Sequence, residues 1–230
     1  DAICKMTDAL FSSFAQQIAS KKQSFSAQQR ALLAEVLEEK YNDLSVSEKL
    51  RSNLHLLQEP NTFTITTGHQ LCLMTGPLYF IYKILHVIKL SADLQEKFPE
   101  QHFVPLYWMA SEDHDFEEIR SFLLFGQKWT WESTQKGAVG QFETNDLQPL
   151  LQALAEKFQN QPESEIHDLI EKFKTPNYGE GFFEFVHELF SVYGLVIMDA
   201  DDARLKEGAW PIWQKDLFTS DLHQAVLKNT

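Results

Sequence analysis

Two apolar segments of the chain each end in a run of polar side chains that could carry chemistry. The first run is Gly68-His69-Gln70, and the second is residues 111–118, which read Ser-Glu-Asp-His-Asp-Phe-Glu-Glu. A glycine lets the backbone approach a ligand, and an imidazole or an amide can donate to a phosphate or carbonyl oxygen. Carboxylates crowded around one imidazole suit general acid/base catalysis, a cationic amine or a divalent metal. Both runs are therefore candidate sites.

The carboxylates of residues 111–118 are expected to perturb one another. Crowding raises the pKa values of neighbouring carboxyl groups and favours the protonated form of His114. The competing interpretation is a solvated acidic cap on the next helix, because Asp and Glu suit the first turn of a helix. The run follows an unusually apolar segment and should therefore lie at a sheet edge, which favours the functional interpretation.

A candidate anion site follows Gln70. A helix is expected to begin at Gly76 or Pro77, and Thr75 and Gly76 would then expose backbone N–H groups to a ligand. Together with the helix dipole, such groups contribute roughly 0.3–1 kcal/mol per exposed charge. A tight strand-to-helix turn with Thr75 as an ordinary cap explains the same residues. Gly68 and Gly76 lie too far apart for a Walker loop or a GxGxxG fingerprint.

A parallel sheet would position these runs. Residues 61–68 alternate apolar side chains with threonine, which favours a strand, and residues 104–110 are almost continuously apolar, as in a strand buried on both faces. Pro105 is tolerable only near the start of that strand. A helical apolar face that continues toward Phe98 joins the two strands into a βαβ unit. Open α/β sheets bind ligands at the carboxyl ends of such strands.

A third short strand is expected at residues 195–198, and it ends in Asp199-Ala200-Asp201-Asp202. Capping of a helix near Ala203 and contact with a ligand explain this run equally well. The chain then divides into four parts: a helical segment (1–60), the first βαβ unit of the core (61–125), an insertion (126–180) and a return to the core of a truncated chain (181–230). The expected fold class is α/β, with a Rossmann-like parallel sheet, amino-terminal helices and an inserted small β/helical segment.

Capping signals define the amino-terminal helices. Residues 7–58 favour three helices, two of which begin at the pairs Ser26 with Gln29 and Ser45 with Glu48. Nothing in these helices suggests chemistry, and a structural cover or partner surface is the expected role.

The insertion is expected to open with a hairpin. Trp129 and Trp131 alternate with polar residues, so the hairpin would span residues 126–145, outside the sheet core, with Gln135-Lys136 as its turn. Two helices would follow it, before a break at residues 175–179.

The composition of the 230-residue chain limits its class. Apolar residues make up 43% of it and aromatic residues 13%, as in a globular protein. A formal charge of -13 repels phosphate backbones, so we expect no nucleic acid partner. Cys4 and Cys72 show no metal-ligand spacing and are expected to be buried small residues of a reduced, cytoplasmic protein, and no metal is assigned. No apolar run approaches the roughly 18 residues that span a bilayer, so no membrane partner is expected.

Four segments, residues 66–70, 75–83, 108–118 and 137–140, together resemble the bacillithiol-biosynthesis cysteine-adding enzyme family, BshC. The resemblance covers nearly the whole chain and implies a Rossmann-type core akin to that of class I aminoacyl-tRNA synthetases. It also implies a ligase that joins cysteine to the amino group of glucosaminyl malate, with ATP or another nucleotide as activating cosubstrate. Members are longer, so the chain resembles their amino-terminal part. A coiled-coil region would lie beyond it, and the full-length protein is expected to be a homodimer.

The resemblance gives the candidate residues three roles. His114 is the expected base that takes a proton from the attacking amine, with Asp113 as the second choice and Glu112 beside them. The expected nucleotide or anion site consists of Gly68, His69, Gln70, Thr75 and Gly76. The substrates are expected to contact Tyr79, Lys83, Ser111, Asp115 and Asp199.

Three other interpretations stay open. An RNA-dependent aminoacyl ligase is disfavoured by the net charge, and Met74 and Pro77 stand where synthetases carry their two signature histidines. A metal-dependent hydrolase could use the acidic-histidine cluster. The chain could also be a scaffold or dimerisation piece that is inactive alone.

Overall fold

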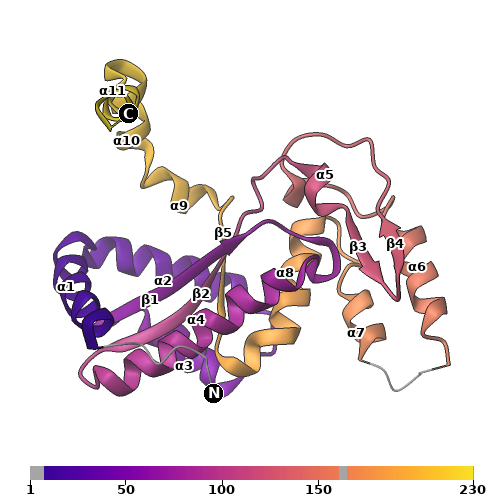
Figure 1. Cartoon of the computed structure of the whole chain (residues 1–230), viewed down its shortest axis with the longest axis horizontal. Helices are drawn as coiled ribbons and strands as arrows, with labels where there is room; N and C mark the ends of the chain where they lie inside the picture. Colours follow the sequence, from indigo (N-terminus) through magenta and orange to yellow (C-terminus); the bar gives the residue numbers. More distant parts are fainter. Residues whose placement is uncertain (1–7, 161–164, 230) are drawn as a thin grey trace.

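The computed structural model describes residues 8–160 and 165–229 (Figure 1). Three helices precede the sheet, as predicted: α1 (Asp8–Ser24), α2 (Ala27–Tyr41) and α3 (Glu48–Leu56). Ser26 and Gln29 form the predicted capping box at the start of α2. The predicted start signal at Ser45 is wrong, because the capping residue directly precedes the helix. Ser47 takes this position, and its hydroxyl oxygen accepts from the Leu50 N–H at 3.1 Å.

A parallel sheet forms the centre of the fold, and the predicted α/β class is confirmed. Within the described residues its strand order is β1 (Thr62–His69), β2 (His102–Met109) and β5 (Val196–Asp199). Pro105 is the fourth residue of β2, deeper in the strand than expected. The ladder to β5 begins only at Leu106, so Pro105 has a strand neighbour on one side alone, where its missing N–H is tolerated.

Helices cover the sheet and one of its edges. Helix α4 (Leu78–Lys97) connects β1 to β2 and packs along both strands (Figure 1). Its Phe80 meets Tyr107 of β2 edge-on, with ring centroids 5.5 Å apart. At the end of α2, the Tyr41 hydroxyl accepts from the Ile197 N–H of β5 at 2.8 Å. Tyr41 thereby gives a partner to a backbone donor on the outer edge of β5.

A hairpin forms earlier in the chain than predicted. β3 (Ser121–Leu124) and β4 (Gln127–Thr130) pair antiparallel around the two-residue turn Phe125-Gly126, whose φ values are 51° and 78°. Two left-handed residues are typical of a tight hairpin turn. The predicted hairpin over residues 126–145 is wrong, because a phenylalanine in this conformation gives no turn signal in the sequence.

A band of aromatic side chains joins the insertion to the sheet. Trp131, expected to lie outside the core, is fully buried and packs on Tyr178 with ring centroids 4.9 Å apart. Tyr178 contacts Phe182, which in turn contacts Phe80 of α4, each pair with centroids 5.9 Å apart. The hydrophobic core is therefore continuous from the insertion to the sheet.

Four more helices and three short 3-10 segments lie before β5. They are α5 (Phe116–Ile119), α6 (Gln148–Lys157), α7 (Ile166–Glu171) and α8 (Tyr178–Phe190), with η1 (Leu73–Thr75), η2 (Val139–Gln141) and η3 (Ser191–Tyr193). Helices α6 and α7 confirm the two that were expected after the hairpin. Helix α8 leads through η3 into β5, also as predicted.

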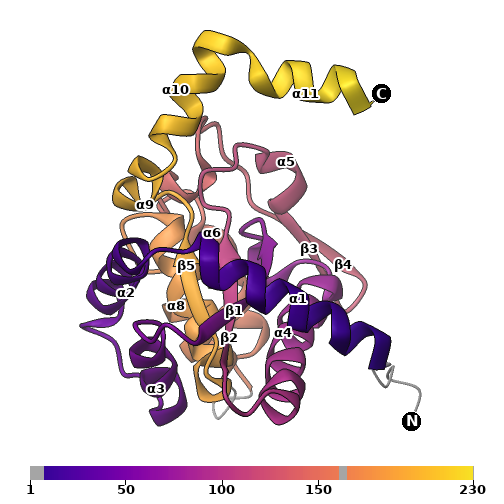
Figure 2. The same cartoon turned by 90° about the vertical axis from the view of Figure 1, so that its left-hand side faces the viewer.

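The chain beyond β5 forms α9 (Ala203–Glu207), α10 (Trp210–Thr219) and α11 (Asp221–Asn229). Figures 1 and 2 show that α10 and α11 extend away from the sheet instead of covering it. Among the helices of residues 8–160 and 165–229, none is both long and apolar enough to cross a membrane.

Candidate functional site

The three polar runs predicted from the sequence meet at one edge of the sheet. His69, Met109 and Asp199 are aligned across β1, β2 and β5 at the last register position of each ladder. The residues that follow these strands therefore lie next to one another, at the carboxyl edge where α/β sheets bind ligands. We refer to this edge as the strand-exit edge.

At the end of β1, His69 is held against aromatic rings. Its imidazole lies edge-on to Phe80 and Tyr79, with centroids 5.6 and 6.3 Å away. Nδ1 lies 3.2 Å from the Gln70 carbonyl oxygen. Burial lowers the pKa of His69, the Gln70 carbonyl opposes this, and the Lys83 charge lowers the pKa further. His69 is therefore uncharged at neutral pH.

Gln70 connects the first strand exit to the second. Its side-chain amide donates to the carboxylates of Asp113 and Glu118, each at 3.0 Å. The Asp115 N–H also donates to Asp113, at 3.0 Å. These two donors, the Asp115 N–H first, lower the pKa of Asp113. The expectation that crowding raises these pKa values is therefore wrong for Asp113, because hydrogen bonds to the ionised form outweigh the burial that raises its pKa.

The loop between β1 and α4 folds tightly on itself. Met74, Thr75 and Gly76 have φ values of 48°, 67° and 51°, and a Cβ atom at position 76 would lie 2.5 Å from the Cys72 Cβ. Only glycine fits there. The Gly76 N–H donates to the Leu73 carbonyl at 2.9 Å and is not available to a ligand.

The start of α4 lacks the cap that the sequence suggested. Pro77, not Thr75, is the capping residue, and no side chain caps the helix. Gly68 lies within β1, where its carbonyl accepts a hydrogen bond from Lys83 Nζ. The Lys83 ammonium also lies 5.3 Å from the centre of the exposed Tyr79 ring. The positive features of this loop are thus Lys83 and the uncapped start of α4.

Cys72 is the buried small residue that was predicted. Burial, followed by the charge of Glu118, raises the pKa of its thiol to about 11. Its Sγ lies 3.5 Å from Nδ1 of His69. A thiol with this pKa is a poor nucleophile near neutral pH. Cys4, the other cysteine, lies outside the described residues.

Ser111 connects the second strand exit to the third. The buried Ser111 hydroxyl donates to the Asp199 carboxylate, and the Ser111 carbonyl accepts from the Gly140 N–H at 2.9 Å. A Cβ atom at position 140 would lie 2.7 Å from the Ser111 Cβ, so glycine is required for this contact. The Val139 N–H donates to the Asp113 carbonyl at 2.7 Å. Residues 137–140, one of the segments that carry the family resemblance, thus hold the backbone of Ser111 and Asp113 in place through two hydrogen bonds.

The remaining carboxylates of residues 111–118 are divided among separate partners. Asp115 caps α5 by accepting from the Glu118 N–H at 3.4 Å, as the competing interpretation of this run predicted. Glu117 pairs with Arg120 at 2.9 Å. Glu112 is exposed and contributes to the electrostatic environment of Lys206. The five carboxylates therefore do not surround one imidazole.

His114 directly follows Asp113, the carboxylate that accepts a hydrogen bond from Gln70. It is exposed and lines an open hollow of about 500 Å³. The other lining residues are Asp115, Phe116, Glu117, Ser133, Thr134, Gln135 and Lys136. The structure thus sets the expected base on solvent-accessible surface beside the residues that follow the hairpin.

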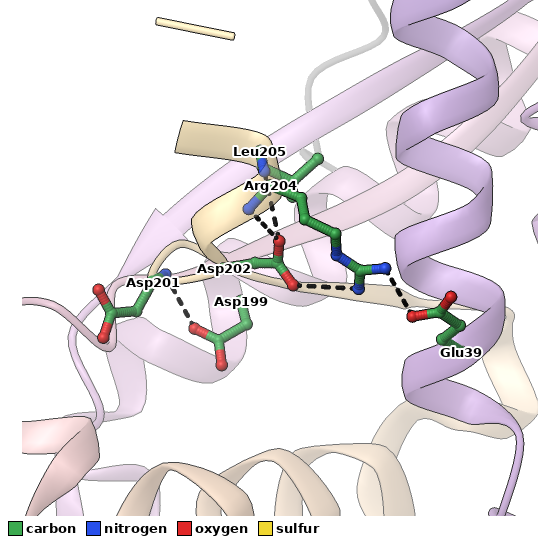
Figure 3. A network of polar contacts seen from close by, with 6 residues as sticks. All are labelled: Glu39, Asp199, Asp201, Asp202, Arg204 and Leu205. Atoms are coloured by element: carbon green, nitrogen blue, oxygen red, sulfur yellow. Dashed lines mark hydrogen bonds and ion pairs between the residues drawn. The ribbon is translucent and has the colours of Figure 1, made fainter. Parts of the chain in front are cut away.

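At the third strand exit, Asp202 caps a helix and Asp199 accepts hydrogen bonds from other residues of the edge (Figure 3). Asp202 accepts from the N–H groups of Arg204 and Leu205, at 2.9 and 3.3 Å, and so confirms the predicted cap of α9. Arg204 then bridges to Glu39 of α2 at 2.6 Å. Asp199 instead accepts from Ser111 and from the Asp201 N–H, the latter at 3.0 Å.

Sequence reasoning missed two residues of the strand-exit edge. Gln141 donates to Asp201 at 3.1 Å, and Lys206 pairs with the same carboxylate. The hydrogen bond that Lys206 donates to Asp201 raises the pKa of Lys206, and the charges of Asp201, Glu112 and Asp199 raise it further. Lys206 is thus a cation within an acidic surface. The position of Lys206 in the sequence does not predict this ion pair, because the pair with Asp201 depends on where α9 begins.

The metal interpretation gains no geometric support. In the part of the chain that the structure describes, there is no group of three or more His, Cys, Asp and Glu side chains placed to hold a metal ion. The carboxylates at the strand-exit edge instead have protein donors as partners.

Comparison with known proteins decides the family. The family model described as "Bacillithiol biosynthesis BshC, N-terminal Rossmann-like domain" matches residues 5–230. The chain belongs to the BshC family. The suspected resemblance and the Rossmann-like fold class are both confirmed by this match.

Curated members of the BshC family align along most of the chain. A Cytophaga hutchinsonii protein named "Putative cysteine ligase BshC" is 43% identical over 202 residues, covering 88% of this chain and 37% of that protein. A Flavobacterium johnsoniae protein of the same name is 40% identical over 216 residues, covering 93% and 41%. A Shouchella clausii protein of that name is 31% identical over 204 residues, covering 84% and 37%. This BshC-family chain thus spans about two-fifths of the length of these relatives.

Proposed function

We propose that this chain is the amino-terminal part of a carbon–nitrogen ligase that joins cysteine to the amino group of glucosaminyl malate. The names of its relatives support a cysteine ligase. The observation that carries the site assignment is the continuous network at the strand-exit edge, where Gln70 and Ser111 connect all three strand ends. Because the chain spans only part of its relatives, we assign it half of an active site.

The acidic residues would bind the amine substrate. Asp113 keeps its charge because its pKa is lowered, so it is suited to attracting an ammonium group and is a weak base. Glu112, exposed beside it, would add to this attraction. Ser111 and Asp199 satisfy each other and would shape the floor of the site, while Asp115 holds α5 in place.

His114 would act as the base. It would first take a proton from the bound ammonium group, and its imidazole is exposed to solvent and substrate. The freed nitrogen lone pair would then attack the activated carboxyl carbon of cysteine, and a C–N bond would form as the leaving group departs with the electrons of its bond. The second proton that the nitrogen loses would pass to the leaving group or to solvent. His69 is less suited to this role because it is packed against Phe80 and Tyr79.

A nucleotide cosubstrate such as ATP would supply the leaving group on the cysteine carboxyl. We assign its phosphates to Lys83 and the uncapped start of α4, beside Thr75 and the exposed ring of Tyr79, because these supply positive charge and free backbone N–H groups. Gly76, Gln70 and His69 would support the loop instead of donating to phosphate, because their donors or rings are held by the protein itself. We propose no role for a metal.

The site assignment is tested in the full-length ligase by assaying cysteine addition and nucleotide consumption together. We expect His114→Ala to lower kcat roughly a hundredfold, as for the loss of a general base. Asp113→Asn should raise KM for the amine more than it lowers kcat. Near-normal turnover in both variants would contradict the roles proposed for His114 and Asp113. Loss of activity with a chelator, restored by a divalent ion, would instead support a metal-dependent hydrolase.

The cellular setting follows from the same proposal. A bacillithiol ligase acts on small molecules, so we propose a cytoplasmic protein without nucleic acid or membrane partners. The full-length enzyme would be a homodimer. Absence of any nucleotide, cysteine or amino sugar binding to the full-length protein by calorimetry would favour a scaffold role.

A further inference from the structure

Helices α10 and α11 carry an apolar surface that is left open by the described part of the chain. Its large side chains are 45–81% exposed, namely Trp210, Ile212, Trp213, Leu217, Phe218, Leu222 and Leu227. Monomeric proteins rarely expose apolar patches above a few hundred Å². A single aromatic side chain presents on the order of 150–250 Å², so this set exceeds that limit. We refer to these seven residues as the terminal helix surface.

Three residues of the terminal helix surface share one face of α10. Trp210, Trp213 and Leu217 recur at the i, i+3, i+7 spacing that places side chains on one side of a helix. The corner between the two helices is also well defined. The Leu222 N–H donates to the Asp216 carboxylate and the Ser220 N–H to the Asp216 carbonyl, both at 2.7 Å. An ordered corner presents both helices together, as a preformed surface.

The comparisons indicate what covers this surface. The matched family model is an amino-terminal domain that extends to residue 230, and α10 and α11 are the last helices within it. More than half the length of the Cytophaga and Flavobacterium relatives lies outside the match. We propose that the terminal helix surface is the docking site for the polypeptide that follows the amino-terminal domain in BshC proteins. A covalently linked segment is favoured over a second copy because linkage gives it a high effective concentration.

Hydrogen exchange in a chimera tests this docking. Residues 1–230 are joined to the carboxyl-terminal part of the Cytophaga hutchinsonii relative, and amide exchange of residues 210–227 is compared with that in the chain alone. We expect exchange to slow by at least roughly tenfold in the chimera, because docking suppresses local opening. Residues 103–109 of β2 serve as the internal standard of folding.

A matched pair of variants separates docking from general effects of charge. Leu217→Asp with Phe218→Asp changes side chains that are 75% and 81% exposed, whereas Leu123→Asp with Phe125→Asp changes hairpin side chains that are 75% and 77% exposed. The first pair should return residues 210–227 to the exchange rate of the chain alone, and the second pair should not.

Three results would overturn the proposal. The first is equal exchange of residues 210–227 in the chimera and in the chain alone. The second is protection in the chain alone that increases with its concentration, which would assign the surface to a second copy. If β2 is unprotected in the chimera, the chimera is not folded, and the full-length Cytophaga relative is measured in its place. The third result is fast exchange in the segment of that relative that corresponds to residues 210–227.

Discussion

Gln70 and Asp113 are joined by a 3.0 Å hydrogen bond that connects the end of β1 to the end of β2. The same amide nitrogen reaches Glu118 at 3.0 Å, so one neutral side chain holds two carboxylates in position. The two polar runs are separate in the sequence, yet the parallel register makes them one unit. Asp113 stays ionised in this unit because its partners are donors.

Removing the Gln70 amide should shift the Asp113 titration. We expect Gln70→Ala to raise the Asp113 pKa part of the way to its ordinary value, since the Asp115 N–H, the larger cause of the lowered pKa, remains. A lowered carboxyl pKa stabilises the fold above the unfolded pKa, so Gln70→Ala should be less stable than the parent at neutral pH. The difference in stability should disappear as the pH falls through the folded pKa of Asp113. The loss should stay below about 1 kcal/mol for this partly exposed group.

Carboxyl NMR titration and urea unfolding measure both effects of Gln70→Ala. Gln152→Ala is the control, because Gln152 also donates to a carboxylate, Glu156, but on the exposed face of α6. An Asp113 titration that is the same in Gln70→Ala as in the parent would contradict the role given to Gln70.

A methyl group at position 140 should disturb the second strand exit. In Gly140→Ala the new Cβ would lie 2.7 Å from the Ser111 Cβ and 2.8 Å from the Ser111 carbonyl oxygen, so backbone must move. Overpacking of this kind costs about 1–3 kcal/mol of unfolding free energy. Gly208→Ala is the control, because its Cβ would make an ordinary 3.4 Å contact. Thermal unfolding compares the two, and equal melting temperatures would show that the loop of residues 137–140 adapts freely.

The elements were easier to predict from the sequence than the contacts of the site. Strand β2 could be predicted from an almost continuous apolar run, and helix α4 from apolar periodicity, because both signals depend only on local side-chain spacing. The turn at Phe125-Gly126 was missed because a left-handed phenylalanine is set by the strands around it. The buried position of Trp131 was missed for a related reason, since its partner Tyr178 is far away in the sequence.

The candidate site shows the same division. The acidic runs that follow β2 and β5 could be found from their residue types, and the parallel pairing of the strands brings their backbones together. Which carboxylate caps a helix and which binds a distant donor could not be foreseen. Asp115 and Asp202 cap the next helix, whereas Asp113 and Asp199 accept from Gln70 and Ser111. Such pairings depend on loop geometry that spacing does not encode.

The Cys72 thiol should resist alkylation in the folded protein. With a pKa of about 11 against an ordinary 9.0, its thiolate fraction near neutral pH is about a hundredfold below that of a free cysteine. In a Cys4→Ser background, iodoacetamide should therefore modify Cys72 only in denaturant. Modification of the folded chain at the rate of a free thiol would contradict the burial.

The same thiol makes stability depend on alkaline pH. The folded state retains the Cys72 proton between about pH 9 and pH 11 while the unfolded state loses it, so stability should fall as pH rises through this window. Cys72→Ala, measured by urea unfolding at both ends of the window, should lose this part of the pH dependence. An unchanged slope would indicate that other groups cause it.

The hydroxyl of Tyr41 should stabilise the open edge of the sheet. It accepts from the Ile197 N–H at 2.8 Å, and both residues are buried. Tyr41→Phe keeps the ring that packs on Phe183 but leaves this buried N–H without its acceptor, which costs about 1–3 kcal/mol. The matched control is Tyr82→Phe, because Tyr82 is 61% exposed and should tolerate the loss. Hydrogen exchange at the Ile197 amide, faster in Tyr41→Phe than in the parent, distinguishes an edge effect from general destabilisation. Exchange that rises equally at β1 and at β5 would contradict it, because the Tyr41 hydroxyl accepts its hydrogen bond from Ile197 of β5.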